Sequence, residues 1–120
     1  MKPTTNTTNS ASPECTVLAA DRGPGEASGT RRIQGEHFDI EFVRIAAGEI
    51  VARSAGAAVG EEVAAVLEGA LLVESGDERY VLSVGEGIVI PPGQGSRWSA
   101  PDAGGLLYRV IVRGVAAAAA

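Results

Sequence analysis

The sequence predicts a small all-β domain, built as a sandwich or barrel of short strands. Glycines interrupt it at intervals of roughly ten residues or fewer, and the segments between them are rich in β-branched and aliphatic side chains. No segment has a convincing helical pattern, because the best candidate, residues 60–67, is short and its apolar stretch lies between glycines. With 120 residues and 45% hydrophobic side chains, the chain can form one core and is too short for two ordinary domains.

The clearest predicted strand covers residues 37–45, in which apolar and polar side chains alternate. One face carries Phe38, Ile40 and Phe42. The other face carries His37, Asp39 and Glu41. We expect His37 to be solvated on this polar face.

Four further strands are predicted from turn chemistry and apolar runs. Residues 70–74 and 79–84 flank a Ser-Gly-Asp loop, whose glycine supplies the positive φ of a hairpin turn. Residues 88–90 run into two prolines, which cannot donate to a sheet and therefore end the strand. The apolar segment 106–113 closes the domain.

A resemblance to a known family lies in residues 85–96, which read GEGIVIPPGQGS. This segment resembles the second conserved motif of the cupin superfamily, which combines a Gly, a Pro-any-Gly triplet and a His. Gly85, Pro91 and Gly93 match that motif. Ser96 stands where the family has its His.

The first cupin motif, in which a His-any-His pair precedes a Glu and a Gly, is matched only in part. Gly48, Glu62 and Gly69 have suitable places, but the window that should hold the histidines, residues 54–58, reads SAGAA. The resemblance as a whole covers about residues 38–113.

This resemblance implies a cupin-type jelly-roll barrel with a ligand cavity at one mouth. Residues 60–67 are then a strand. Many single-domain cupins pair as dimers, and we expect a homodimer that buries the outer apolar face of an alternating N-terminal strand. The expected layout is a disordered arm at 1–16, a single cupin domain at 17–114 and a short alanine tail at 115–120.

Metal-dependent cupins use three His and one Glu as ligands, and most of this set is missing. The sequence has one histidine, His37, which lies outside both motifs, and it keeps only Glu62. Even a site of two His and one carboxylate cannot be built from a chain with a single His. We therefore predict no metal and no other cofactor.

Six residues are candidates for binding a small molecule in the barrel: Glu62, Ser96, Trp98, Arg53, Ser54 and Tyr108. A Glu62 that points into the barrel could accept a hydrogen bond or carry a proton. Ser96 and Trp98 share a strand face, so they would offer a hydroxyl and a stacking plane. The alternative is a satisfied hydroxyl beside a Trp that fills the core.

Arginines are the other candidates for ligand contact. Arg53 and Ser54 lie in the strand that should carry the histidines, and Arg44 shares the parity of the apolar side chains in 37–45. A guanidinium in the cavity would suit a carboxylate or phosphate, whereas the alternative is an Arg that reaches solvent past its apolar stem. Tyr80 and Tyr108 could act as acids, as a Tyr does in cupin epimerases, but the His base of those enzymes is absent.

Composition excludes several classes of protein. The net charge of −5 has the wrong sign for binding nucleic acid, and no apolar run approaches the roughly 20 residues of a membrane span. The single cysteine, Cys15, cannot form a disulfide within the chain, which fits a reducing bacterial cytoplasm.

The sequence therefore predicts a metal-free cupin that binds a small, partly apolar molecule without chemistry, as a sensor, carrier or accessory protein. The main alternative is a metal-independent isomerase, cyclase or lyase that uses Glu62 with a Tyr or Ser96. A second alternative is an inert dimerising domain whose pocket is filled by Trp98 and aliphatic side chains.

Overall fold

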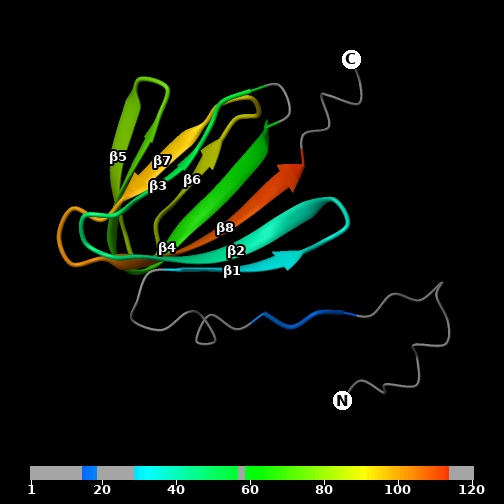
Figure 1. The fold of residues 1–120 in the computed structure, drawn as a ribbon, viewed down its shortest axis with the longest axis horizontal. Helices are drawn as coiled ribbons and strands as arrows, with labels where there is room; N and C mark the ends of the chain where they lie inside the picture. The colour runs from blue at the N-terminus through cyan, green and yellow to red at the C-terminus, as the bar shows by residue number, and fades with distance from the viewer. Residues whose placement is uncertain (1–14, 19–28, 57–58, 114–120) are drawn as a thin grey trace, which may run out of the picture.

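The computed structural model describes residues 15–18, 29–56 and 59–113, and all its regular elements are β-strands (Figure 1). The strands are β1 (Gly29–Gln34), β2 (Phe38–Ile45), β3 (Ile50–Arg53), β4 (Val59–Ser75), β5 (Glu78–Ser83), β6 (Gly87–Ile90), β7 (Ser96–Ser99) and β8 (Gly105–Arg113). The all-β prediction is confirmed. None of the described residues forms a helix long and apolar enough to cross a membrane.

The strands form one curled antiparallel sheet that makes half of a barrel. Its main path runs β1-β2-β8-β4-β7-β3, and β5 and β6 also pair with β4. The first half of β4 pairs with β6 and β8, and the second half pairs with β5 and β7, so β4 belongs to two layers. The ends of the path, β1 and β3, do not pair with each other, which leaves an open side between them (Figure 1).

The long strand β4 changes from one layer to the other at Gly69. Its register with β8 shifts between Val66 and Glu68, which marks a β-bulge, and Gly69 follows with a φ of +73°. A Cβ at this position would clash with the carbonyl oxygen of Gly104. A glycine is therefore required where the backbone bends against the loop that precedes β8.

The structure confirms the strands predicted from turn chemistry and from the cupin motifs. A turn at Gly76, with a φ of +61°, joins β4 to β5, and β6 ends directly before Pro91. Residues 60–67 lie in β4 and residues 106–113 in β8.

The first strand, β1, is not among the predicted ones. Its sequence GTRRIQ has one aliphatic residue among polar ones, so it lacks the alternation that identifies β2. This segment forms a strand because it pairs with β2. The predicted arm at 1–16, apart from its last two residues, and the predicted tail at 115–120 lie outside the described residues and stay predictions.

The polarity of the two faces of β2 does not predict which face is buried. Val43 and Ile45 point into the curled sheet and belong to its core, and Glu41 lies on their side of the strand. The face that carries Phe38 is the outer one, where Phe42 packs against Tyr108 of β8 with ring centroids 5.1 Å apart. The polar face of the predicted strand is thus the interior face.

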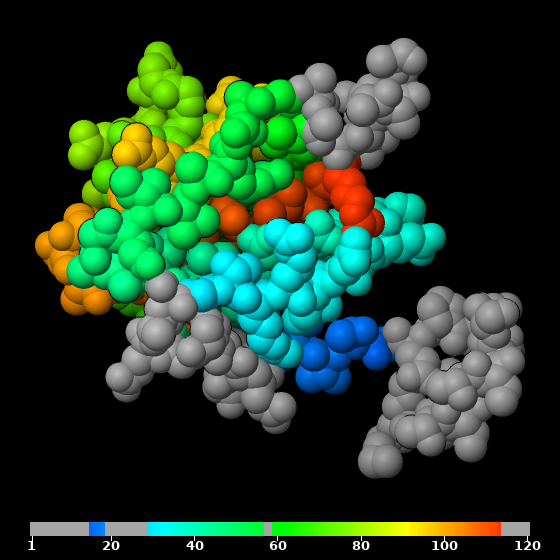
Figure 2. All heavy atoms as spheres, in the orientation of Figure 1, coloured from blue at the N-terminus to red at the C-terminus, as the bar shows by residue number. Residues whose placement is uncertain are grey.

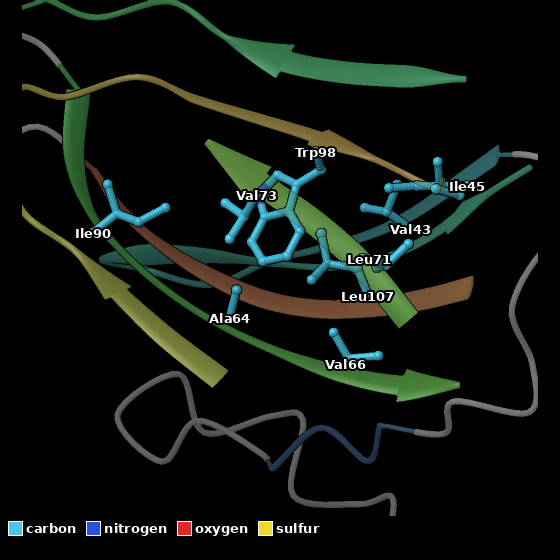
Figure 3. Close-up of a cluster of buried hydrophobic side chains, with 10 residues drawn as sticks. Val43, Ile45, Ala64, Val66, Leu71, Val73, Ile90, Trp98 and Leu107 are labelled. Carbon is cyan, nitrogen blue, oxygen red and sulfur yellow. The ribbon is translucent and has the colours of Figure 1, made fainter. Parts of the chain in front are cut away.

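One part of the interior is filled by a cluster of buried apolar side chains (Figure 3). The cluster consists of Val43, Ile45, Ala64, Val66, Leu71, Val73, Ile90, Trp98, Ala100 and Leu107. Both halves of β4 contribute, so the cluster holds the two layers together. Trp98 has no exposed surface, which shows that the indole fills the core.

Candidate functional site

Five charged side chains form a continuous chain of ion pairs across the open side of the half-barrel. In order they are Arg32, Glu41, Arg109, Glu62 and Arg53, from β1, β2, β8, β4 and β3. Figure 2 views this side, where orange-red atoms of β8 are visible between the cyan β1–β2 hairpin and the green segment that includes β3. The alternating charges therefore connect the two unpaired edges of the sheet.

Glu62 is the most enclosed member of this chain, with 1% of its surface exposed. Its Oε1 accepts hydrogen bonds from Arg53 Nη1 and Ser96 Oγ, both at 3.1 Å. Its Oε2 accepts from Trp98 Nε1 at 3.3 Å and from Arg109 Nη1 at 3.5 Å. Four donors from three strands thus hold one carboxylate, as a buried charge requires.

Glu41 occupies an equivalent position between two guanidiniums. Its Oε1 accepts from Arg109 Nε and its Oε2 from Arg32 Nε, both at 2.9 Å. Burial alone would raise the pKa of Glu41, but the charge of Arg109 and the hydrogen bonds from both arginines outweigh burial and hold that pKa below its ordinary value. The same contact raises the pKa of Arg32, through the hydrogen bond to Glu41 and its charge.

Strand register explains why these side chains meet. Glu41 lies directly opposite Arg32 on β1 and opposite Arg109 on β8, and Arg53 lies opposite Ser96 on β7. Directly opposite residues of antiparallel strands point to the same side of the sheet. One group, Arg32, Glu41 and Arg109, therefore faces the interior, and so does the other group, Arg53 and Ser96. Glu62 lies between these two groups.

The structure brings together four of the six predicted binding residues. Ser96, Trp98 and Arg53 all donate to Glu62. Of these, Trp98 belongs both to the apolar core and to the hydrogen-bonded site.

The other two predicted binding residues, Ser54 and Tyr108, are not part of this cluster. Ser54 is exposed beyond the end of β3, and Tyr108 lies on the outer face of β8 against Phe42. Tyr108 faces outward because its neighbour Arg109 faces inward. Arg44 also lies on the outer face and pairs with Glu68 at 3.0 Å, and His37 is solvent-exposed as expected.

The chain of ion pairs includes three residues that the sequence did not identify as candidates: Arg32, Glu41 and Arg109. Arg109 carries a usable signal, because it shares its strand face with Leu107 and Ile111 and must be paired if they are buried. That Arg109 meets Glu41 depends on the β2–β8 register, which local sequence does not contain.

No protein-family model and no curated protein sequence matches this chain. Solved structures do match it. An RmlC-like cupin family protein with a double-stranded β-helix fold from Methanocaldococcus jannaschii is similar with a TM-score of 0.69 and 11% identity, over 82% of this chain and 92% of that one. A cupin superfamily protein from Desulfitobacterium hafniense is similar with a TM-score of 0.65 and 13% identity, over 84% and 93% of the two chains. The chain has the cupin fold.

A third similar structure is the cupin domain of an XRE family transcriptional regulator from Enterobacter cloacae. Its TM-score is 0.64 and its identity 15%, over 72% of this chain and 96% of that domain. These similarities confirm the predicted cupin-type double-stranded β-helix. At such identities they show the fold alone.

The residues around Glu62 do not fit a metal ion. Its partners are two guanidiniums, a hydroxyl and an indole N–H, all of which donate hydrogen bonds to a carboxylate instead of coordinating a cation. Within the described ranges, no three His, Cys, Asp or Glu side chains form a group that could hold a metal. The histidine window of the first motif, 54–58, begins beyond β3, so Arg53 is the residue that meets Glu62 from this strand.

Proposed function

We propose that this cupin binds a small, partly apolar molecule on the open side of its half-barrel, without a metal and without chemical conversion. The observation that carries the proposal is the position of Arg53. Its Nη1 bonds to the buried Glu62, yet 21% of its side chain is exposed. A surface depression of about 430 Å³ beside β3 and β7 is bordered by Arg53 and Ser96, the two partners of Glu62 Oε1, and also by Glu74 and Arg97.

The surroundings of this arginine favour a ligand with a polar and an apolar part. On one side lies the chain of ion pairs, and on the other lies the half-buried Val51, which covers the fully buried Trp98 opposite it on β7. A binding site with a few fixed polar groups beside an apolar wall is typical of small-molecule pockets. Binding without turnover would suit a sensor, a carrier or an accessory protein.

Native mass spectrometry of the purified protein, followed by a metabolite screen with Trp fluorescence, tests this proposal. Trp98 is the only tryptophan and bonds to Glu62, so a ligand that shifts Glu62 changes its emission. We expect Glu62→Gln to weaken the ligand about five- to 150-fold, because Arg53 loses the carboxylate that positions it, and a buried hydrogen bond is worth about 1 to 3 kcal/mol.

The matched control for this experiment is Glu61→Gln, which changes the exposed neighbour on the opposite face of β4. It should leave affinity unchanged. Equal affinities of Glu62→Gln and the wild type for every ligand found would contradict the proposal.

A metal-independent enzyme is the second candidate, favoured by the 3.1 Å hydrogen bond between Ser96 and Glu62. Both oxygens of Glu62 already accept two donors each, so proton transfer from a substrate would first require one donor to leave. Recovery of a chemically altered ligand, with turnover lost in Glu62→Gln at unchanged affinity, would favour this candidate.

We also propose that the protein is a homodimer, joined through the outer face of the layer that contains β1, β2, β8, β4 and β6. An apolar row crosses these five strands, each member directly opposite the next: Ile33, Ile40, Val110, Val63 and Val89. Val63 and Val89 are 46% and 59% exposed, and such a face favours association.

Light scattering of the wild type and two variants tests the homodimer. Val63→Glu should give a monomer, because it places a charge in the apolar row. Val81→Glu, at an exposed valine of the other layer, should leave the dimer intact. A monomeric wild type at micromolar concentration would overturn this proposal.

A further inference from the structure

The chain of ion pairs carries one more positive than negative charge. It contains three guanidiniums, Arg32, Arg109 and Arg53, and two carboxylates, Glu41 and Glu62. The molecule as a whole has a net charge of −5, so this local surplus runs against its overall charge. A surplus cation at a partly buried position is a suitable partner for an anion, because the attraction is stronger there than in bulk water.

Among the residues that the structure describes, the unused hydrogen-bond donors lie at the two ends of the chain of ion pairs. In the middle, Arg109 directs Nε and Nη2 to Glu41 and Nη1 to Glu62, so all three of its nitrogens are occupied. At one end, Arg53 has a single acceptor among the described residues, which its Nη1 contacts. Its Nε and Nη2 remain, and they form the edge of a guanidinium that can hold an oxyanion with two parallel hydrogen bonds.

At the other end of the chain of ion pairs, Arg32 offers a weaker position for an anion. Arg32 donates to Glu41 through Nε and Nη2, and its side chain is 62% exposed. Its third nitrogen, Nη1, has no acceptor within residues 15–18, 29–56 and 59–113. Solvent screens an exposed charge more than a partly buried one. Arg53, at 21% exposed, is therefore the stronger of the two anion-binding positions.

We propose that the ligand of this cupin carries a carboxylate, which binds to the free edge of Arg53 on the open side. This rests on the proposed function, since it names the chemical class of the molecule bound at the same site. One unit of surplus charge matches a monoanion, whereas a phosphate monoester would bring close to two negative charges near Glu62 and Glu41. The apolar remainder of the ligand lies toward the half-buried Val51.

The test compares ligands that differ only in charge. Small aryl and alkyl carboxylates, beginning with benzoate and phenylacetate, are titrated into the full-length protein beside their primary amides and phenyl phosphate, with emission of Trp98 as the readout. We expect each carboxylate to bind about 10- to 100-fold more tightly than its amide, because the charge-assisted hydrogen bonds are lost in the amide. Phenyl phosphate should bind more weakly than benzoate.

Substitutions at two arginines locate the site. Arg53→Gln should abolish the difference between acid and amide, whereas Arg79→Gln, at an exposed arginine of β5 away from this depression, should preserve it. Arg53→Lys should keep a preference for the acid but reduce it, since Lys cannot form two parallel hydrogen bonds. If Arg53→Gln fails to fold, the wild-type series and the lysine variant still decide the question.

The outcomes separate this inference from the function on which it rests. Amides that bind as tightly as their acids, or a preference for acids that survives in Arg53→Gln, would overturn the carboxylate proposal while binding itself stands. Tighter binding of phenyl phosphate than of benzoate would also overturn it. If neither acids, amides nor phenyl phosphate bind and native mass spectrometry finds no retained molecule, both proposals fail.

Discussion

Leu107 and Arg109 lie on the same face of β8, two residues apart, yet they belong to interior regions of different character. Leu107 is fully buried in the apolar cluster, opposite Val43 of β2 and Val66 of β4. Arg109, at 4% exposed, lies between Glu41 and Glu62 in the chain of ion pairs. The same strand thus passes from an apolar region into a charged one.

Burial contributes differently to the stability of the fold in these two regions. Apolar surface stabilises the fold in proportion to the area removed from water, at about 25 cal/mol per Å². Charged groups lose their hydration on burial, and their mutual attraction offsets that loss only when every partner is present. The charged region is therefore a poor source of stability and a good source of fixed, oriented cations.

Removal of one charged partner should have the largest effect on stability. We expect Arg109→Leu to reduce the free energy of unfolding by about 3 to 5 kcal/mol, because it leaves two buried carboxylates without their shared partner. Leu107→Ala should reduce it by about 2 to 5 kcal/mol through the cavity that it creates. Denaturant unfolding of both variants, matched in strand and face, makes the comparison.

A triple variant separates the contribution of the intact charged region from the cost of breaking it. Combining Arg109→Leu with Glu41→Leu and Glu62→Gln removes the buried charges and keeps an amide oxygen as an acceptor for the buried donors of Ser96 and Trp98. This variant should regain most of the stability lost in Arg109→Leu. A triple variant less stable than Arg109→Leu would show instead that the intact chain of ion pairs stabilises the fold.

A smaller effect is expected from restoring metal ligands in the charged region. Arg53 and Ser96 both contact Oε1 of Glu62 at 3.1 Å, so Arg53→His with Ser96→His places two imidazoles beside one carboxylate. At 100 times its dissociation constant, Zn²⁺ or Co²⁺ should stabilise this double variant by about 2.7 kcal/mol. Thermal unfolding with and without metal measures the gain.

The wild type and the single variant Ser96→His are the controls for this experiment. Both retain Arg53, and neither should be stabilised by the metal. Elemental analysis of untagged wild-type protein should likewise find well under one equivalent of transition metal. A stoichiometric metal that survives dialysis in the wild type would contradict the view that Arg53 supplies the positive charge here.

The fold could be predicted from the sequence because its signals are local. Turn residues and the Pro-any-Gly triplet at Pro91 act within a few positions, and they identify β4 to β6 and the cupin type. The strand β1 could not be predicted in this way, since its two arginines and single isoleucine form a strand only by pairing with β2.

The candidate site could be predicted only in part, for a related reason. Glu62 and Ser96 match positions of the two cupin motifs that the sequence resembles, so the sequence alone identifies them as candidates. Glu41 lies on a face whose polarity resembles that of a solvated strand, and only its register with Arg109 shows that this face is interior. Long-range pairing decides which polar face is buried, and the alternation pattern alone does not contain it.

The smallest effect that distinguishes the two regions is the response of stability to acid. The pKa of Glu41 is held below its ordinary value of 4.5, so its carboxylate stabilises the fold above that value. As the pH falls from about 4.5 through the lower pKa of the folded state, this contribution is lost. The apolar region contains no titrating group and contributes equally at every pH.

Glu41→Gln tests this assignment. The variant should be less stable than the wild type at neutral pH, because two guanidiniums lose their anion, and its stability should fall less steeply below about pH 4.5. One titrating group can change the slope by at most about 1.4 kcal/mol per pH unit. Leu107→Ala should instead lower the whole curve without changing its slope. Denaturant unfolding of both variants across the acid range measures the slopes.

Equal slopes in the wild type and Glu41→Gln would show that Glu41 does not govern the loss of stability in acid. The charged region would then resemble the apolar one in its response to pH.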